Sequence, residues 1–496
     1  MLDTLRSTIK GTLIYSLGNM VSKLMGFILI PLYTTRLTTA EYGILGLTDV
    51  SVQILVAVYG VSLYSAYFRW YWDKNYIKNQ KSIFFTILVF IASISLVISL
   101  LLYSLKDHLS VLLFDNAGYS YIISLLLFSS CLEALCVVVL TLIRLQEKPG
   151  FYSLLNILKL LVSLVFTVYF VVVKGKKAEG IYEAQIIGNM VFFLVSATYI
   201  IKNIHIRFER KILGEMIAFS MPLLLTSITG IILTVTDRYV LKFKTDLYQV
   251  GIYNLGFRIA NTLRVFIITS VQLALQPIIF RMIDSPNAKR FYSKVMTYFT
   301  YGLMFFVLFI SLFGKEIVKV LSRNISYWEA SNVIPVLCFA ILFTMLRDVS
   351  LTGINLTKRT TVTAMVVMVV ACVNIALNLL LIPVFQYMGA AFAALISQAL
   401  YFGMIYFFSQ KYFRIPYELN KVALMVTVAV VMCILSLLIN DLSLALRLII
   451  KSMMIIAFPL VLYPFGFYER IEIERLGQFW NKWKKPGKWG EYFKKL

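Results

Sequence analysis

The chain has 496 residues, of which 60% are hydrophobic and only 14% are charged, and its mean hydropathy is +0.83. A soluble fold needs charged side chains to cover its surface, so this composition excludes an ordinary water-soluble protein. The 47 Lys and Arg residues against 24 Asp and Glu give a net charge of +23. In a membrane protein, such an excess indicates basic cytoplasmic loops rather than nucleic-acid binding.

Apolar runs long enough to cross a bilayer recur along almost the whole chain, separated by short breaks that contain charged residues, Gly or Pro. They predict an all-α polytopic membrane protein with about fourteen transmembrane helices. The connecting loops are too short to contain a soluble domain. The predicted spans are residues 11–33, 43–67, 82–105, 119–143, 150–173, 181–201, 213–236, 250–280, 295–314, 331–354, 361–384, 388–410, 421–440 and 444–466.

Basic residues are distributed unequally between the two sides of these spans. The side of the amino terminus holds 22 Lys and Arg residues and the opposite side holds 13, which include Arg238, Lys242 and the cluster 174–177. Because basic residues are retained in the cytoplasm, both termini are expected to be cytoplasmic. The tail at 467–496 mixes basic and aromatic residues, which fits either a segment lying on an anionic membrane surface or a solubilising tail.

Two short segments of the chain resemble each other. Residues 41–47 read EYGILGL and residues 249–255 read QVGIYNL. Six predicted helices separate them and both enter the membrane from the same side, which predicts two parallel six-helix bundles with a binding site between them. The expected domains are an N-terminal bundle at 1–201, a cytoplasmic linker at 202–212, a second bundle at 213–410, two additional helices at 411–466 and the tail at 467–496.

Polar and ionisable side chains interrupt several apolar spans. A charge at bilayer depth costs about 2.5–3.5 kcal/mol on insertion scales, so such residues normally face a cavity or a partner. The substrate-binding candidates are Asn19, Lys23, Asp49, Gln53, Lys159, Arg258, Asn261, Arg264 and Gln272, with Glu133 and Asp49 as candidates for structural pairing and Asn156 and Gln185 as further polar residues.

The polar residues of two spans fall on narrow stripes. At about 100° per residue, those of the eighth span share about one third of the helix surface, and the second span carries a stripe of its own. Lipid-facing residues would not cluster in this way, so the stripes predict a water-lined interior. They comprise Asn254, Arg258, Asn261, Arg264, Gln272 and Gln276 in the eighth span, and Asp49, Gln53, Gly60, Tyr64 and Tyr67 in the second.

The charges within the spans favour a basic cavity. Four cations face two acids, and a cavity of this sign favours an anionic cargo, since the planar guanidinium of Arg binds phosphate oxygens well. Pairing of Lys23 with Asp49, and of Lys159 with Glu133, would instead only hold helices together. Because Arg258 and Arg264 have no acid on their own helix, a role in binding cargo is favoured for both.

Catalytic and metal-binding patterns are not found in the sequence. It contains no Gly-rich phosphate loop, no HExxH motif and no nucleophile elbow. The five cysteines and two histidines lack metal-ligand spacing. We therefore expect a protein that is not an enzyme and uses no metal or cofactor.

Two segments resemble a known family. Residues 18–47 read GNMVSKLMGFILIPLYTTRLTTAEYGILGL, and residues 373–398 read VNIALNLLLIPVFQYMGAAFAALISQ. Both resemble the polysaccharide transporter family, the Wzx-type O-antigen and repeat-unit flippases of the multidrug/oligosaccharidyl-lipid/polysaccharide (MOP) exporter superfamily. Length and topology agree along nearly the whole chain. The same motifs occur more loosely in multidrug (MATE) exporters and in the lipid II flippase.

The resemblance implies a V-shaped, MATE-like architecture in the bacterial cytoplasmic membrane. It implies a flippase that moves undecaprenyl-pyrophosphate-linked oligosaccharide repeat units across that membrane, by alternating access, for O-antigen, capsule or exopolysaccharide synthesis. Lys23 occupies the place of a basic cavity residue found in the first helix of related flippases. The partners implied are the lipid-linked oligosaccharide and membrane lipid, with a glycan polymerase and a chain-length regulator as candidates and no nucleic acid.

Two other functions stay open at this point. A cation-coupled, MATE-like multidrug exporter is disfavoured because one large class of these proteins carries an acidic residue in the first helix, where this chain has none. A membrane polysaccharide polymerase or ligase is disfavoured because it would be expected to show a large outer loop.

Overall fold

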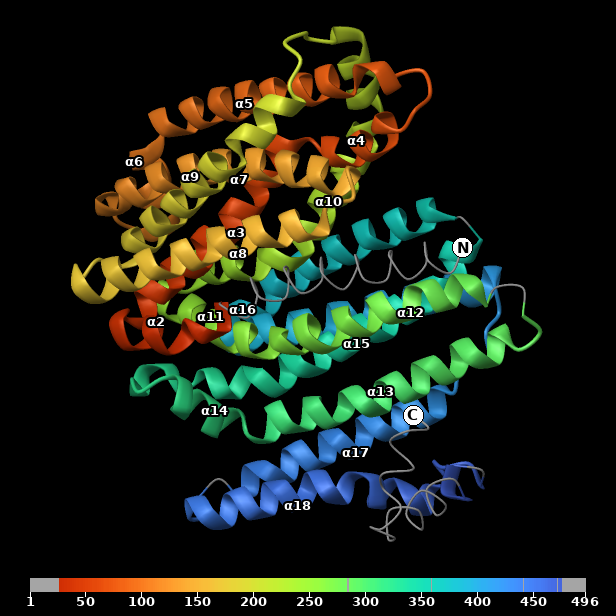
Figure 1. Cartoon of the computed structure of the whole chain (residues 1–496). Helices are drawn as coiled ribbons and strands as arrows, with labels where there is room; N and C mark the ends of the chain where they lie inside the picture. The colour runs from red at the N-terminus through yellow and green to blue at the C-terminus, as the bar shows by residue number, and fades with distance from the viewer. Residues whose placement is uncertain (1–25, 283–284, 358, 440, 471, 475–496) are drawn as a thin grey trace, which may run out of the picture. The chain divides into compact units, whose positions relative to one another are not determined.

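The computed structural model describes residues 26–282, 285–357, 359–439, 441–470 and 472–474, and these residues form helices and loops without a strand (Figure 1). Eleven helices in this part of the chain are long and apolar enough to cross a membrane. The α-helices are α2 (Ile30–Arg36), α3 (Thr39–Gly60), α4 (Leu63–Tyr71), α5 (Gln80–Ser104), α6 (Lys106–Phe114), α7 (Ser120–Leu145), α8 (Pro149–Val168), α9 (Ala178–Asn203), α10 (Arg210–Lys244), α11 (Leu247–Thr262), α12 (Thr269–Arg281), α13 (Ala288–Leu312), α14 (Gly314–Leu321), α15 (Ala330–Leu356), α16 (Thr360–Tyr412), α17 (Leu419–Leu438) and α18 (Leu444–Leu462).

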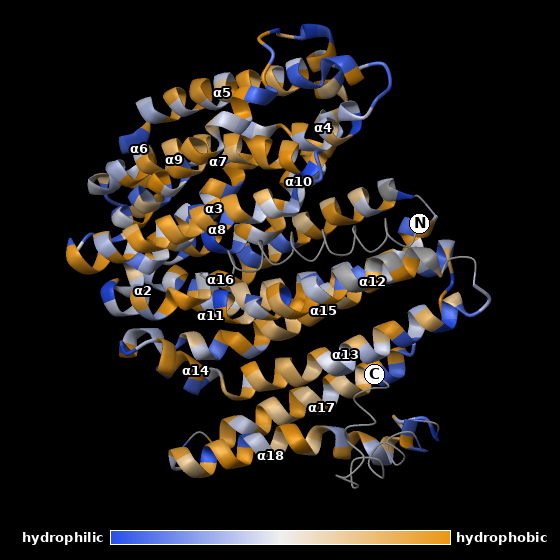
Figure 2. Cartoon of the chain, in the orientation of Figure 1, coloured by the Kyte–Doolittle hydropathy of each residue, from blue (hydrophilic) through white to orange (hydrophobic). Residues whose placement is uncertain are grey.

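The surface of these helices is suited to lipid. Figure 2 shows hydrophobic residues along most of the length of the long helices and hydrophilic residues mainly at their ends and in the loops. Large apolar side chains such as Leu101, Val165 and Leu380 are exposed on the long helices. Water would not tolerate so many, whereas the hydrocarbon core of a bilayer favours them. The protein is therefore a multi-pass α-helical membrane protein, as the composition predicts.

Several predicted spans are joined or divided in the observed helices. Helix α16 contains two of them, at 361–384 and 388–410, because the chain reverses at Gln386, whose φ is 52°. Gly389 permits this reversal, since a Cβ there would lie 2.3 Å from the carbonyl oxygen of Leu381. The span predicted at 250–280 is divided into α11, a wider π-helical turn and α12. The span predicted at 11–33 lies mostly outside the described residues.

Helices of the first half recur in the second half at a spacing of 208 residues. Helices α5 and α13 begin at residues 80 and 288, and the shorter α6 and α14 begin at 106 and 314. Asn116 and Asn324, at the same spacing, each accept a hydrogen bond from the backbone N–H two residues later, at 2.8 and 3.0 Å. The similarity between residues 41–47 and 249–255 thus extends to whole helices and their caps.

Helices α3 and α11 cross at the two glycines of this repeat. A Cβ on Gly43 would lie 2.1 Å from the carbonyl oxygen of Leu247, and a Cβ on Gly251 would lie 2.0 Å from that of Thr39. The two contacts are reciprocal, because each partner is again 208 residues from its counterpart. Any side chain larger than hydrogen would push the backbones apart. The crossing therefore fixes how the polar faces of α3 and α11 meet.

Helix α10 extends further than the sequence suggests. The span predicted to end at 236 is wrong at this end, because the helix continues to Lys244 and includes Arg238 and Lys242. Both side chains are buried because each has a polar partner. Arg238 contacts Asp237 at 3.3 Å, and Lys242 donates to Asp115 at 2.5 Å. From sequence alone, a charged residue near the end of a span is assigned to a loop unless its buried partner is known.

The predicted cluster of basic residues at 174–177 is also held by acids. Lys176 donates to Glu183 at 2.6 Å and Lys177 contacts Glu41 at 2.5 Å. Hydrogen bonds to these carboxylates raise the pKa of both lysines. Since two of its lysines are paired, the cluster is a weak indicator of orientation, and the expected cytoplasmic location of both termini stays a prediction.

The chain divides into two compact units. The first comprises residues 1–284 and 314–414, and the second comprises 285–313 and 415–496. Within the second, Lys294 of α13 donates to Glu418 at 2.8 Å and also contacts Glu469. Both polar cavities described below lie within the first unit. The division into two six-helix bundles with two additional helices stays a prediction.

Candidate functional site

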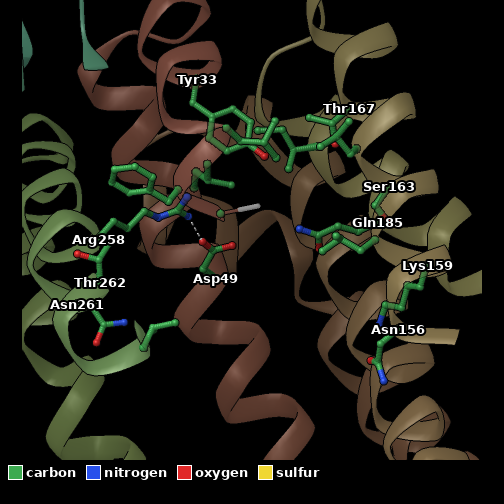
Figure 3. Close-up of a pocket in the computed structure, with 18 of the residues that line it drawn as sticks. Tyr33, Asp49, Asn156, Lys159, Ser163, Thr167, Gln185, Arg258, Asn261 and Thr262 are labelled. Carbon is green, nitrogen blue, oxygen red and sulfur yellow. Dashed lines mark hydrogen bonds and ion pairs between the residues drawn. The ribbon is translucent and has the colours of Figure 1, made fainter. Parts of the chain in front are cut away.

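The first unit encloses a cavity of about 780 Å³. Residues of α3, α7, α8, α9, α11 and α12 line it, together with residues that precede and begin α2. Figure 3 shows Asp49 and Arg258 on one side of the cavity, with Asn156 and Lys159 on a helix across from them. Three cations and two acids are among the described lining residues, namely Lys159, Arg258, Arg264, Asp49 and Glu133. The cavity is therefore polar and weakly basic.

Asp49 and Arg258 form an ion pair between α3 and α11. The glycine crossing brings the two helices together about two turns before these residues, so that their polar faces meet in the cavity. The hydroxyl of Tyr182 also donates to Asp49, at 3.1 Å. On its other side, the guanidinium of Arg258 lies 5.4 Å from the ring centroid of Tyr42. Arg258 is thus bound within the protein and is only partly available to a ligand.

Lys159 and Glu133 form a second ion pair on the opposite wall. The Nζ atom of Lys159 on α8 lies 2.5 Å from Oε2 of Glu133 on α7. This is the pairing that the sequence suggests as one alternative for these residues. Asn156, one turn earlier on α8, uses its side-chain amide to donate to the carbonyl oxygen of Tyr152 at 2.9 Å. The pair leaves little net charge on this wall.

Among the described cations of the cavity, Arg264 differs from Lys159 and Arg258 because it has no ion-pair partner in the described part of the chain. Its side chain is exposed and lines the cavity, and it makes no hydrogen bond or ion pair with any residue that the structure describes. It lies in the π-helical turn Leu263–Ile268 between α11 and α12. Such turns are rare and often occur at functional sites. The positive charge that the cavity can offer to a ligand is therefore mainly that of Arg264.

The π-helical turn also changes which residues share a face. It contains one residue more than an α-helical turn, so the residues after it are displaced by about 100° from their positions on a regular helix. Gln272 therefore moves from the face of Arg258 to that of Arg264, and both line the cavity. Gln272 donates to Asp348 of α15 at 2.7 Å, and Asp348 in turn accepts from Arg347. Asn261, just before the turn, lines the cavity as well.

A second cavity, of about 660 Å³, shares part of its wall with the first. Asp49, Glu133 and Gln185 line both, so these three residues mark where the cavities meet. All residues of the stripe predicted along the second span line this second cavity, including Gln53, a predicted substrate-binding residue. The stripe residues are Asp49, Gln53, Gly60, Tyr64 and Tyr67.

The two cavities contain most of the residues predicted for the site. Asn19 and Lys23 lie outside the described residues, so the predicted contact between Lys23 and Asp49 stays a prediction. The partner that the structure provides for Asp49 is Arg258, although a pairing across two helices is not visible in the sequence. Tyr33 and Tyr182 were missed, because a buried tyrosine counts as apolar until its neighbours are known.

Residues 8–283 match the family of polysaccharide biosynthesis proteins. The chain belongs to this family. A curated relative, the uncharacterized membrane protein MJ1068 of Methanocaldococcus jannaschii, is 22% identical over 294 residues. That match covers 57% of this chain and 56% of the relative, so it spans little more than half of the relative's length. The resemblance to a polysaccharide transporter family is confirmed.

Two solved transporters have a similar fold. The lipid II flippase MurJ in an inward closed conformation has a TM-score of 0.65 at 15% identity, over 94% of this chain and 100% of that one. An inward-facing multidrug resistance MATE family transporter of the MOP superfamily has a TM-score of 0.61 at 14% identity, over 80% of this chain and 94% of that one. The predicted fold class, an all-α polytopic protein of the MOP and MATE type, is confirmed. At these identities the likeness concerns the fold alone.

Proposed function

We propose that this protein is a flippase that moves undecaprenyl-pyrophosphate-linked oligosaccharides across the cytoplasmic membrane for the synthesis of a surface polysaccharide. Membership of a polysaccharide biosynthesis family supports the glycan, and the fold shared with MurJ supports movement of a lipid-linked substrate. The observation that carries the proposal is the guanidinium of Arg264, which lines a polar membrane cavity and has no partner among the residues that the structure describes.

Arg264 has the chemistry required to hold a pyrophosphate. An exposed guanidinium without an acid partner can donate two parallel hydrogen bonds to phosphate oxygens. Within a membrane, such a charge is costly unless a ligand or water satisfies it. Arg258 can contribute only by giving up part of its contact with Asp49. We therefore place Arg264 first and Arg258 second among the residues that bind phosphate, with Asn261 beside them.

Alternating access would exchange the side to which this cavity opens. The internal repeat, with its reciprocal contact between α3 and α11, supports a motion of two related halves around the cavity. The sugar and pyrophosphate would pass through the polar interior while the prenyl chain stays in lipid. In this proposal, the glycan polymerase and the chain-length regulator act on the product after it has crossed.

A cation-coupled multidrug exporter fits the cavity less well. Such a protein would use an available carboxylate to bind its driving cation or a cationic drug. Asp49 and Glu133, the two acids among the described lining residues, are already paired with Arg258 and Lys159. The remaining charge is positive, which favours an anionic cargo.

Deletion of the gene in its host tests the proposed function. We expect surface polysaccharide to disappear and the lipid-linked repeat unit to accumulate in the membrane, because synthesis continues while transfer stops. Extraction of the lipid fraction and analysis of its pyrophosphate-linked sugars measures the accumulation. Unchanged surface polysaccharide, or a loss without any accumulated lipid-linked precursor, would contradict the proposal.

A further inference from the structure

The second cavity differs from the first in charge. No Lys, Arg or His is among the described residues that line it, whereas the first cavity contains three cations. Its two acids, Asp49 and Glu133, lie at the shared boundary and meet their cations on the side of the first cavity. A second anionic group placed in this cavity would face carboxylates without a cation beside it.

The neutral wall of the second cavity is rich in hydrogen-bonding groups. The amides of Gln53 and Gln185 and the hydroxyl of Ser227, which is only partly buried, lie among apolar residues. Amides and hydroxyls both donate and accept, as sugar hydroxyls do. Tyr64 adds a ring that is 45% exposed, and the face of such a ring can cover the apolar face of a sugar. This combination is typical of a site for an uncharged polar ligand.

We propose that the second cavity is the subsite for the uncharged saccharide part of the cargo, and that it disfavours sugars that carry a carboxylate. This inference rests on the proposed function, in which the first cavity holds the pyrophosphate. The shared boundary at Asp49, Glu133 and Gln185 lets one molecule occupy both cavities at once. A volume of about 660 Å³ lies within the usual range for ligand sites and accommodates a short oligosaccharide.

An acidic sugar would be rejected for electrostatic reasons. Its carboxylate would lose water on entering the cavity and would face Asp49 and Glu133. The cations paired with these two acids line the first cavity and are not among the residues that line the second. Specificity by repulsion of this kind needs no additional contact to the correct ligand. The charge difference between the two cavities thus predicts a preference for neutral glycans.

Gly60 offers a way to fill the second cavity without disturbing the fold. It lies on the cavity wall, and a Cβ built there would have no atom within 4 Å. The series Gly60→Ala, Gly60→Leu and Gly60→Trp should therefore narrow the cavity in steps. Gly403 on α16 is a matched control, because a Cβ there also meets open space and Gly403 lines neither cavity.

The experiment uses the full chain, purified and reconstituted in liposomes with three synthetic lipids. These are undecaprenyl pyrophosphate carrying a neutral trisaccharide, the same lipid carrying a single neutral hexose, and the trisaccharide with one hexuronic acid. Transport is measured as the change in sugar accessible to an impermeant exoglycosidase added outside. We expect the unmodified protein to move the acidic lipid about tenfold or more slowly than its neutral counterpart.

The glycine variants separate the saccharide subsite from the rest of the protein. Gly60→Trp should slow the neutral trisaccharide about tenfold while the single-hexose lipid keeps its rate, and Gly60→Leu should give a smaller effect of the same kind. Gly403→Trp should change neither rate.

Three results would overturn the inference. These are an unchanged trisaccharide rate in Gly60→Trp, equal slowing of both neutral lipids in that variant, and equal rates of the acidic and neutral trisaccharides in the unmodified protein. If the unmodified protein moved none of the three lipids, the proposed function would fail and the saccharide subsite with it.

Discussion

Replacement of Arg264 by alanine should slow transport without destabilising the protein. The guanidinium is exposed to the cavity and has no partner in the described part of the chain, so its removal costs the fold no polar contact that the structure shows. A charge-assisted hydrogen bond to phosphate is worth about 1.5–3 kcal/mol, and about 1.4 kcal/mol corresponds to a factor of ten. The loss of even one such bond should therefore reduce transport about tenfold. Arg264→Lys should be intermediate, because it keeps the charge and loses the planar fork.

Surface polysaccharide provides the assay for the Arg264 variants. Cells that carry each variant as the only copy are compared by blot, normalised to the amount of protein inserted in the membrane. Arg323→Ala is a suitable control, because Arg323 is also exposed but lies in a loop away from both cavities. If Arg264→Ala is stable and gives normal polysaccharide, Arg264 does not bind the cargo.

Three further predictions follow from the ion pair, the helix crossing and the charge distribution. Asp49→Ala should lower the amount of membrane-inserted protein, because it leaves Arg258 without its partner; the loss in folding free energy should be about 3 kcal/mol or less, since the pair is partly exposed. Arg258→Gln in the same chain should restore the amount. Equal amounts of the single variant and the wild type would contradict this prediction. Gly251→Ala should cost about 1–3 kcal/mol by separating α3 from α11, seen as a lower midpoint of thermal unfolding in detergent, and an unchanged midpoint would count against the crossing. In a chain without other cysteines, Lys289→Cys should resist an impermeant thiol reagent in intact cells while Asp115→Cys reacts, and the reverse result would invert the predicted orientation.

The fold class can be predicted from the sequence because membrane spans depend on local composition. Apolar runs of bilayer length identify most helices without knowledge of their neighbours. The two segments at 41–47 and 249–255 indicate an internal repeat because close packing of α3 and α11 requires glycine at equivalent positions. The division of the eighth span could not be predicted, since no residue in Leu263–Ile268 indicates a π-helical turn.

In the candidate site, too, features that depend on one helix could be predicted and contacts between distant helices could not. The stripe from Asp49 to Tyr67 predicts a cavity wall correctly, because its residues all face one polar interior. The partner of Asp49 could not be predicted, since Arg258 is brought to it by a helix crossing more than 200 residues later in the chain. The burial of Lys242, beyond the predicted end of its span at 236, could not be predicted for the same reason, since its partner Asp115 is 127 residues away. Ion pairing determines which of the described cavity cations can bind a ligand, and Arg264 is the one without an ion-pair partner among the described residues.

Transport by the purified protein in liposomes is the direct test of the proposed flippase function. We expect the unmodified chain to equilibrate an undecaprenyl-pyrophosphate-linked neutral oligosaccharide between the two leaflets, while liposomes without protein do not. Undecaprenyl phosphate carrying the same sugar, with one phosphate fewer, should move more slowly, because Arg264 then has fewer phosphate oxygens to bind. Equal and negligible movement of the pyrophosphate lipid with and without the protein would contradict the proposed flippase function.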